Sequence, residues 1–124
     1  MPRIATIGSH TALQILKGAK SEGFESIVIC TPDQEKIYRN LFPIADKIIV
    51  INKYSDFFSI EKQLIDLDAI IIPHGSFVAY LDEKAHQKMQ VRYFGNKNIL
   101  SWESDRRKQK EWLAEAEVKL PQVF

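Results

Sequence analysis

Four short runs of apolar, mostly β-branched residues constrain what this chain can fold into more than any other feature. They cover residues 4–7, 27–30, 48–51 and 69–72, and polar residues hardly interrupt them. A strand that is buried on both faces of a parallel sheet has this composition, whereas a strand with one face in water alternates apolar and polar residues. Neighbouring parallel strands need long connections, which helices usually supply. The runs therefore predict a parallel sheet that is covered by helices.

The segments between these runs have helical periodicity. After the first run, apolar residues recur at helical spacing as far as Gly23, a residue typical of a helix C-terminus. Ser9 or Thr11 is expected to cap the start of this helix. Between the third and fourth runs, a helix is predicted to turn Phe57 and Leu64 towards the core.

A further helix is predicted directly after the second run. Thr31, Pro32 and Gln34 fit an N-cap, a proline in the first turn and the partner of a capping box. The helix that they open is expected to extend to about Asn40.

The alternation of strands and helices predicts the fold class. A β-α-β series with right-handed crossovers favours an α/β, Rossmann-like, doubly wound sheet that is mainly parallel, with helices on both faces. The pattern after residue 76 is less regular. It predicts helical turns between 78 and 87, a fifth strand at 91–94 and a last helix over 104–116.

Composition limits what the chain can do. Residues 1–124 make one ordinary domain, and 17 basic against 16 acidic residues leave a net charge of +1, so no overall field attracts nucleic acid. No apolar run approaches the roughly 20 residues of a membrane span. The single cysteine, Cys30, lies in an apolar run, which predicts a buried thiol and fits a reducing, cytoplasmic compartment.

Two segments that join a predicted strand to the following helix contain small and hydrogen-bonding residues. Residues 8–14 follow the first run and residues 73–80 follow the fourth. Helix N-termini at such places offer backbone N–H groups to anions, at the carboxyl ends of the strands. If the fourth strand lies beside the first, Ser9 and His10 face the segment His74-Gly75-Ser76 across one crevice. A purely structural role for these glycines and serines, in turns and caps, remains the alternative.

Other chemistries fit the sequence less well. Residues 8–13 lack the second and third glycines of a dinucleotide-binding loop, and no P-loop is present. Zinc binding by His10, His74 and His86 is disfavoured, because two of them follow different strands and the third lies in a polar stretch. A hydrolase that pairs Ser76 or Ser9 with a histidine lacks the G-x-S-x-G elbow and an oriented third residue.

Four stretches together resemble a known family. They are Ile4–Lys20, Ile71–Tyr80, Phe94–Asn96 and Trp102–Arg106, and they look like the N-terminal domain of archaeal FAICAR synthetase. That family is the formate-dependent ligase of purine biosynthesis in the ATP-grasp superfamily. The resemblance implies a reaction in which ATP activates formate to formyl phosphate. The exocyclic amine of the ribonucleotide AICAR then attacks it and gives FAICAR.

The resemblance also implies roles for particular residues. The family's substrate-binding histidine and serine match His10 and Ser76. Gly8, Ser9 and Gly75 would shape the loops and offer backbone N–H groups. The chain would hold the phosphorylated ribonucleotide AICAR, without catalytic or metal-binding residues of its own.

The expected cofactors belong elsewhere in such an enzyme. ATP and Mg²⁺ bind the ATP-grasp portion, and no segment of these 124 residues resembles that portion. The resemblance therefore implies a substrate-binding domain, inactive alone, whose partners are AICAR and the ATP-grasp portion. An apolar patch facing that portion makes self-association a further expectation. A non-catalytic nucleotide- or phosphate-binding module, or an interaction module, is the alternative function.

Overall fold

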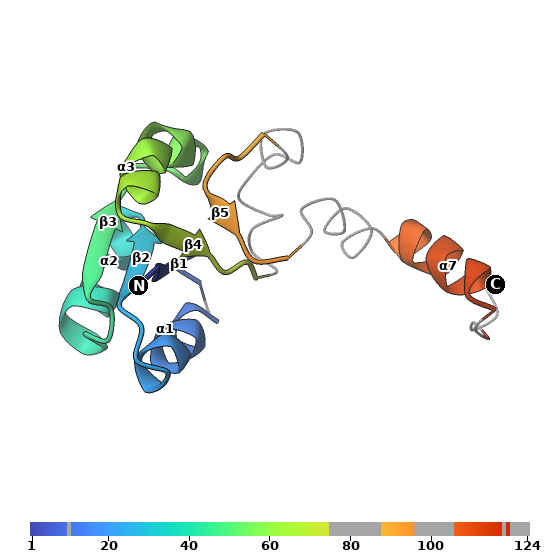
Figure 1. Cartoon of the computed structure of the whole chain (residues 1–124), viewed down its shortest axis with the longest axis horizontal. Coiled ribbons are helices and arrows are strands. Elements are labelled where there is room, and N and C mark those ends of the chain that lie inside the picture. Colours follow the sequence, from blue (N-terminus) through green and yellow to red (C-terminus); the bar gives the residue numbers. More distant parts are fainter. Residues whose placement is uncertain (10, 75–87, 96–105, 118, 120–124) are drawn as a thin grey trace.

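The computed structural model contains one parallel sheet, and it describes residues 1–9, 11–74, 88–95, 106–117 and 119. All pairs of neighbouring strands are parallel, and the strand order is β3-β2-β1-β4-β5 (Figure 1). The strands are β1 (Arg3–Ile7), β2 (Ser26–Cys30), β3 (Lys47–Val50), β4 (Ala69–Ile71) and β5 (Arg92–Tyr93). The four apolar runs thus form β1 to β4, as the sequence predicted, and the fold class is confirmed.

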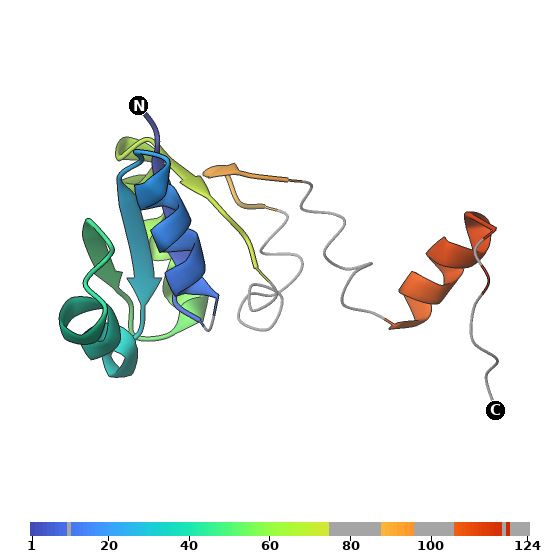
Figure 2. The ribbon, with the colours of Figure 1, turned by 90° about the horizontal axis from the view of Figure 1, so that it is seen from below.

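Helices cover both faces of the sheet. α1 and α2 lie on one face and α3 on the other, as Figures 1 and 2 show. The bounds are α1 (Ala12–Ser21), α2 (Pro32–Lys36) continued by the π-helix η1 (Ile37–Leu41), the 3-10 helix η2 (Tyr54–Ile60) continued by α3 (Glu61–Asp66), and α7 (Arg106–Glu115). The chain steps from β1 to β3 in one direction and reaches β4 and β5 in the other. Right-handed crossovers then require helices on opposite faces.

Each face has its own hydrophobic core. On the α3 face, Phe57 and Leu64 are fully buried among side chains of the inner strands, and Phe57 stacks edge-on against Phe58 at 5.6 Å. On the α1 face, Leu16 and Cys30 are fully buried in a smaller cluster. Burial, followed by the nearby carboxylate of Glu35, raises the pKa of the Cys30 thiol to about 11. The thiol is therefore protonated at neutral pH, as expected of a buried cysteine.

The second helix differs from its prediction in one respect. Thr31 is its N-cap and Pro32 occupies the first turn, as expected, but no side-chain capping bond forms. The side chain of Gln34, the expected capping-box partner, is hydrogen-bonded to the Tyr54 hydroxyl instead. The helix reaches Leu41, close to the predicted end, although its last turn has π geometry.

The C-terminal part agrees with its predictions in outline. β5 has two residues where four were predicted, and α7 lies within the predicted last helix. α7 contributes no buried residue, and its Trp112 and Leu113 are exposed. The helical turns predicted between 78 and 87 lie outside the described residues. In the described part of the chain, no helix is long and apolar enough to cross a membrane.

Truncation of Phe57 tests the core on the α3 face. Phe57 is 0% exposed, so Phe57→Ala should lower the free energy of unfolding by about 3–5 kcal/mol, through lost burial and the cavity left behind. Phe94 is 70% exposed, and Phe94→Ala should change the free energy of unfolding by less than about 0.5 kcal/mol. Urea unfolding followed by circular dichroism measures both. Equal losses in the two variants would contradict this description of the core.

Candidate functional site

The loops that follow β1 and β4 meet at one edge of the sheet. The two strands are direct neighbours, with Ala5 paired to Ile71, so their carboxyl ends lie side by side. The order of the strands reverses between β1 and β4, and ligands of open α/β sheets bind outside the carboxyl ends at such a point. The sequence analysis placed the candidate site between strands 1 and 4 on the condition that they are neighbours, and the structure meets this condition.

His74 links the two loops. Its Nε2 atom lies 2.8 Å from the carbonyl oxygen of Ile7 and 3.3 Å from the Oγ atom of Ser9. A carbonyl oxygen can only accept, so Nε2 carries a hydrogen and donates it to Ile7. Burial lowers the pKa of His74 from 6.5, against the opposing effect of the bond to Ile7. The ring is therefore neutral at pH 7, with its hydrogen on Nε2.

This tautomer argues against a Ser9–His74 hydrolase. A general base must accept the serine proton on the nitrogen that faces the hydroxyl. In this structure that nitrogen already carries a hydrogen and donates it to a backbone carbonyl. The hydrogen bond from Nε2 to Ile7 joins the two segments, and the longer contact with Ser9 does not activate the serine.

Of the two residues predicted to cap α1, Ser9 and not Thr11 makes the hydrogen bonds at its start. Thr11 occupies the N-cap position, but its side chain makes no capping bond, because its backbone is helical rather than extended. Ser9 supplies the bonds instead. Its carbonyl accepts from the Ala12 N–H at 3.2 Å, and its Oγ accepts from the Thr11 N–H at 3.3 Å. Ser9 thus ties the loop both to α1 and to His74.

Gly8 is where two other elements approach the loop. A Cβ atom at this position would lie 3.0 Å from both the Oε1 atom of Gln34 and a ring carbon of Tyr38. A side chain at this position would force Gln34 and Tyr38 to shift by a few tenths of an ångström, whereas glycine fits this close approach of α2 and η1. The glycine that the sequence placed in this loop therefore has a packing reason.

Two tyrosines that the sequence analysis did not single out contact the backbone of this loop. The Tyr54 hydroxyl has one hydrogen, which it shares between the Oε1 atom of Gln34 at 2.5 Å and the carbonyl of Gly8 at 3.1 Å. The Tyr38 hydroxyl donates to the carbonyl of Ser9 at 3.4 Å. Their positions shortly after β2 and β3 were the available signal, since the carboxyl ends of all parallel strands lie at the same edge.

The structure places only some of the predicted site residues. Gly8 and Ser9 lie at the β1/β4 edge, beside His74. His10, Gly75 and Ser76 lie outside the described residues, so their roles stay predictions. Among the residues that the structure describes, no three His, Cys, Asp or Glu side chains converge as metal ligands would.

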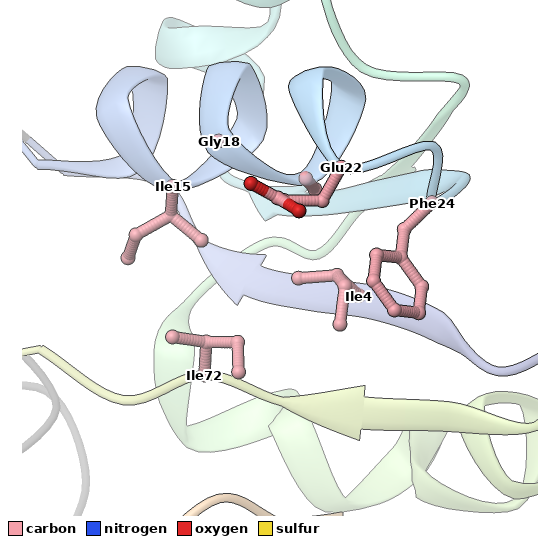
Figure 3. A pocket seen from close by; sticks show the side chains of 7 residues that line it. Ile4, Ile15, Gly18, Glu22, Phe24 and Ile72 are labelled. Carbon is pink, nitrogen blue, oxygen red and sulfur yellow. The ribbon is translucent and has the colours of Figure 1, made fainter.

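An apolar hollow lies elsewhere on the domain, on the α1 face. Ile4, Ile15, Phe24 and Ile72 line it, and the Glu22 carboxylate is its charged group, as Figure 3 shows. A lining of this kind, with a negative charge, does not suit a phosphate. The loop edge at β1 and β4 therefore remains the candidate site for an anionic ligand.

The fold is that of a doubly wound α/β domain whose strand order reverses between β1 and β4. Within this class, the chain belongs to the family described as "Protein of unknown function (DUF1246)", whose model matches residues 4–124.

Similar proteins with a curated name support the resemblance seen in the sequence. A 5-formaminoimidazole-4-carboxamide-1-(beta)-D-ribofuranosyl 5'-monophosphate synthetase of Pyrococcus abyssi is 49% identical over 122 residues, which are 98% of this chain and 34% of that protein. The synthetase of the same name from Methanobrevibacter smithii is 45% identical over 124 residues and is also matched over 34% of its length. This name is that of FAICAR synthetase, so the resemblance is confirmed. The chain spans about a third of the length of these relatives.

Solved structures agree. The chain matches a crystal structure of an IMP biosynthesis protein PurP from Thermococcus kodakaraensis with a TM-score of 0.83 and 37% identity, over 98% of this chain and 39% of that one. It also matches N5-carboxyaminoimidazole ribonucleotide synthetase from Thermotoga maritima, with a TM-score of 0.70 and 22% identity, over 98% of this chain and 33% of that one. At this lower identity the likeness concerns the fold alone.

Two glycine substitutions should have opposite effects. Gly8→Ala should lower the free energy of unfolding by about 1–3 kcal/mol, because the new methyl group presses on Gln34 and Tyr38. Gly18 lies in α1, where an added Cβ atom would meet nothing within 4 Å. Gly18→Ala should therefore raise the free energy of unfolding by about 0.4–1 kcal/mol. Thermal and urea unfolding measure both changes. A Gly8→Ala variant as stable as the parent would contradict the close approach at this loop.

The state of His74 gives a pH-dependent signature. Its folded pKa lies below 6.5, so the unfolded chain binds this proton more readily, and the His74 contribution to stability falls as the pH drops below about 6.5. NMR of the imidazole ring should give a pKa below 6.5 and, at neutral pH, nitrogen shifts of the Nε2–H tautomer. A pKa at or above 6.5 would contradict the partly buried position of the ring.

Proposed function

We propose that this chain forms the nucleotide-substrate side of an ATP- and formate-dependent ligase that formylates AICAR to FAICAR in purine biosynthesis. The observation that carries the proposal is the link from Ser9 to His74 across the β1/β4 edge. This contact brings together the two segments that resemble the substrate loops of FAICAR synthetase. The names of the similar proteins point to the same chemistry.

In this proposal the two loops hold the phosphorylated ribonucleotide. His10 and Ser76 donate hydrogen bonds to the phosphate or ribose, as their match to the family's substrate-binding residues suggests. Gly8, Ser9 and Gly75 shape the loops, and Ser9 and Gly75 offer backbone N–H groups near the start of α1, where anions are favoured. The Gly8 N–H, expected from the sequence to be a further donor, is already bonded to the Ile29 carbonyl of β2.

ATP and Mg²⁺ are assigned to the rest of the enzyme. The resemblance gives both to the ATP-grasp portion, and no segment of these 124 residues resembles that portion. The matched relatives are about three times as long as this chain, and we place the ATP-grasp portion in their remaining length. A ligase of purine biosynthesis acts in the cytoplasm, and we expect this chain there.

Ligand binding tests the proposal directly. AICAR should bind the 124-residue chain, with NMR shifts centred on residues 8–11 and 73–77, and its dephosphorylated nucleoside should bind less tightly. Hydrogen bonds to a charged group contribute about 1.5–3 kcal/mol. His10→Ala and Ser76→Ala should therefore each weaken AICAR binding by roughly ten- to a hundred-fold.

His86→Ala is the matched control, because it removes a histidine that the resemblance does not place in the substrate site. It should leave AICAR binding unchanged. Equal affinity for nucleotide and nucleoside, or shifts centred far from the two loops, would overturn the proposal. Binding of unrelated phosphates as tight as that of AICAR would favour a phosphate-binding module without this substrate.

A further inference from the structure

Three successive backbone carbonyls, at the end of β1 and in the loop that follows it, each accept a hydrogen bond from a side chain of a different segment. The Ile7 carbonyl accepts from His74 at 2.8 Å, the Gly8 carbonyl from Tyr54 at 3.1 Å, and the Ser9 carbonyl from Tyr38 at 3.4 Å. We call these three donors the carbonyl clamp. They come from the segment after β4, from η2 and from η1, so three separate parts of the chain converge on one short loop.

The clamp removes an obstacle to anion binding. A carbonyl oxygen carries partial negative charge and repels a phosphate, whereas backbone N–H groups attract it. Each donor of the clamp neutralises part of that charge. Each bond also fixes the rotation of the peptide plane to which the carbonyl belongs.

Fixing the Gly8 carbonyl determines where the next N–H group points. The Gly8 N–H donates to the Ile29 carbonyl of β2 at 2.7 Å. The Gly8 carbonyl accepts from the Tyr54 hydroxyl, which also contacts Gln34 of α2. In a planar trans peptide, the carbonyl and the following N–H point in opposite directions. The Ser9 N–H therefore points away from the Tyr54 hydroxyl.

We infer that Tyr54 is a positioning residue for the ligand: it holds the Gly8–Ser9 peptide so that the Ser9 N–H donates to a phosphate group in the β1/β4 crevice. The inference rests on the proposed function and deepens it, because it names what gives the loop its preference for a phosphorylated ligand. Tyr38 supports the same orientation one residue further along.

Tyr54→Phe tests the hydroxyl alone. The Tyr54 ring packs against the core of the α3 face, so a phenylalanine keeps that packing and loses the bonds of the hydroxyl to Gly8 and Gln34. Ser59→Ala is the matched control. It removes a hydroxyl of the same helix η2 that bonds a backbone carbonyl, that of Asp56 at 2.6 Å, and does not contact the loop.

The measurement compares the affinities of the nucleotide AICAR and of its nucleoside in the full 124-residue chain, by NMR titration. Loss of one hydrogen bond should weaken AICAR binding about three- to ten-fold in Tyr54→Phe. Nucleoside affinity should change less than about two-fold, since no phosphate reaches the loop. Ser59→Ala should match the parent for both ligands.

The outcomes separate the inference from the proposed function. A parent chain that binds nucleotide and nucleoside equally overturns the proposed function. A parent that prefers the nucleotide, with the same preference in Tyr54→Phe, overturns only the positioning role, and so does an equal loss for both ligands.

A second measurement needs no variant. Inorganic phosphate added to the isotope-labelled parent chain should shift the Ser9 amide resonance strongly downfield, as expected for an N–H that donates to the anion. The Gly8 amide, already bonded to Ile29, should shift little. A Ser9 amide that does not respond overturns the inference, even if Tyr54→Phe fails to fold.

Discussion

The site depends on the parallel pairing of β1 with β4. This pairing reverses the strand order and leaves the carboxyl ends of the two strands adjacent. The chain between β1 and β4 includes two strands and all the helices from α1 to α3, so segments distant in sequence meet at one edge. The contact between Ser9 and His74, 65 residues apart, exists only because of this pairing.

The strands were the most predictable part of the fold, and the physical reason is their burial. Strands covered on both faces need apolar residues throughout, so β1, β2 and β4 stand out in the sequence. The edge strand β5 carries less of this signal and proved shorter than predicted. The change from α to π geometry at Ile37 was not predictable, because it depends on how the last turn fits against the rest of the fold rather than on the residues' own helical preferences.

The candidate site was predictable only in part. Small polar residues after two buried strands indicated where loops would meet, and the described part of that edge holds Ser9 and His74 as expected. Tyr38 and Tyr54 were missed, because their partners are backbone carbonyls, which leave no pattern of their own, and the position of each tyrosine shortly after a strand was a weak signal. Gln34 was assigned to a helix cap for the same reason, since its contact with Tyr54 depends on tertiary structure.

Because the acceptors of the carbonyl clamp are backbone atoms, mutations affect its acceptors and its donors differently. Every residue type supplies a carbonyl oxygen, so substitutions at Ile7 or Ser9 leave the accepting atom in place. Each donor, in contrast, is one side-chain group that a single codon change removes. Genetic variation can therefore abolish the clamp through His74, Tyr54 and Tyr38. In the loop itself, Gly8 is the position where variation is restricted, and there the cause is space rather than hydrogen bonding.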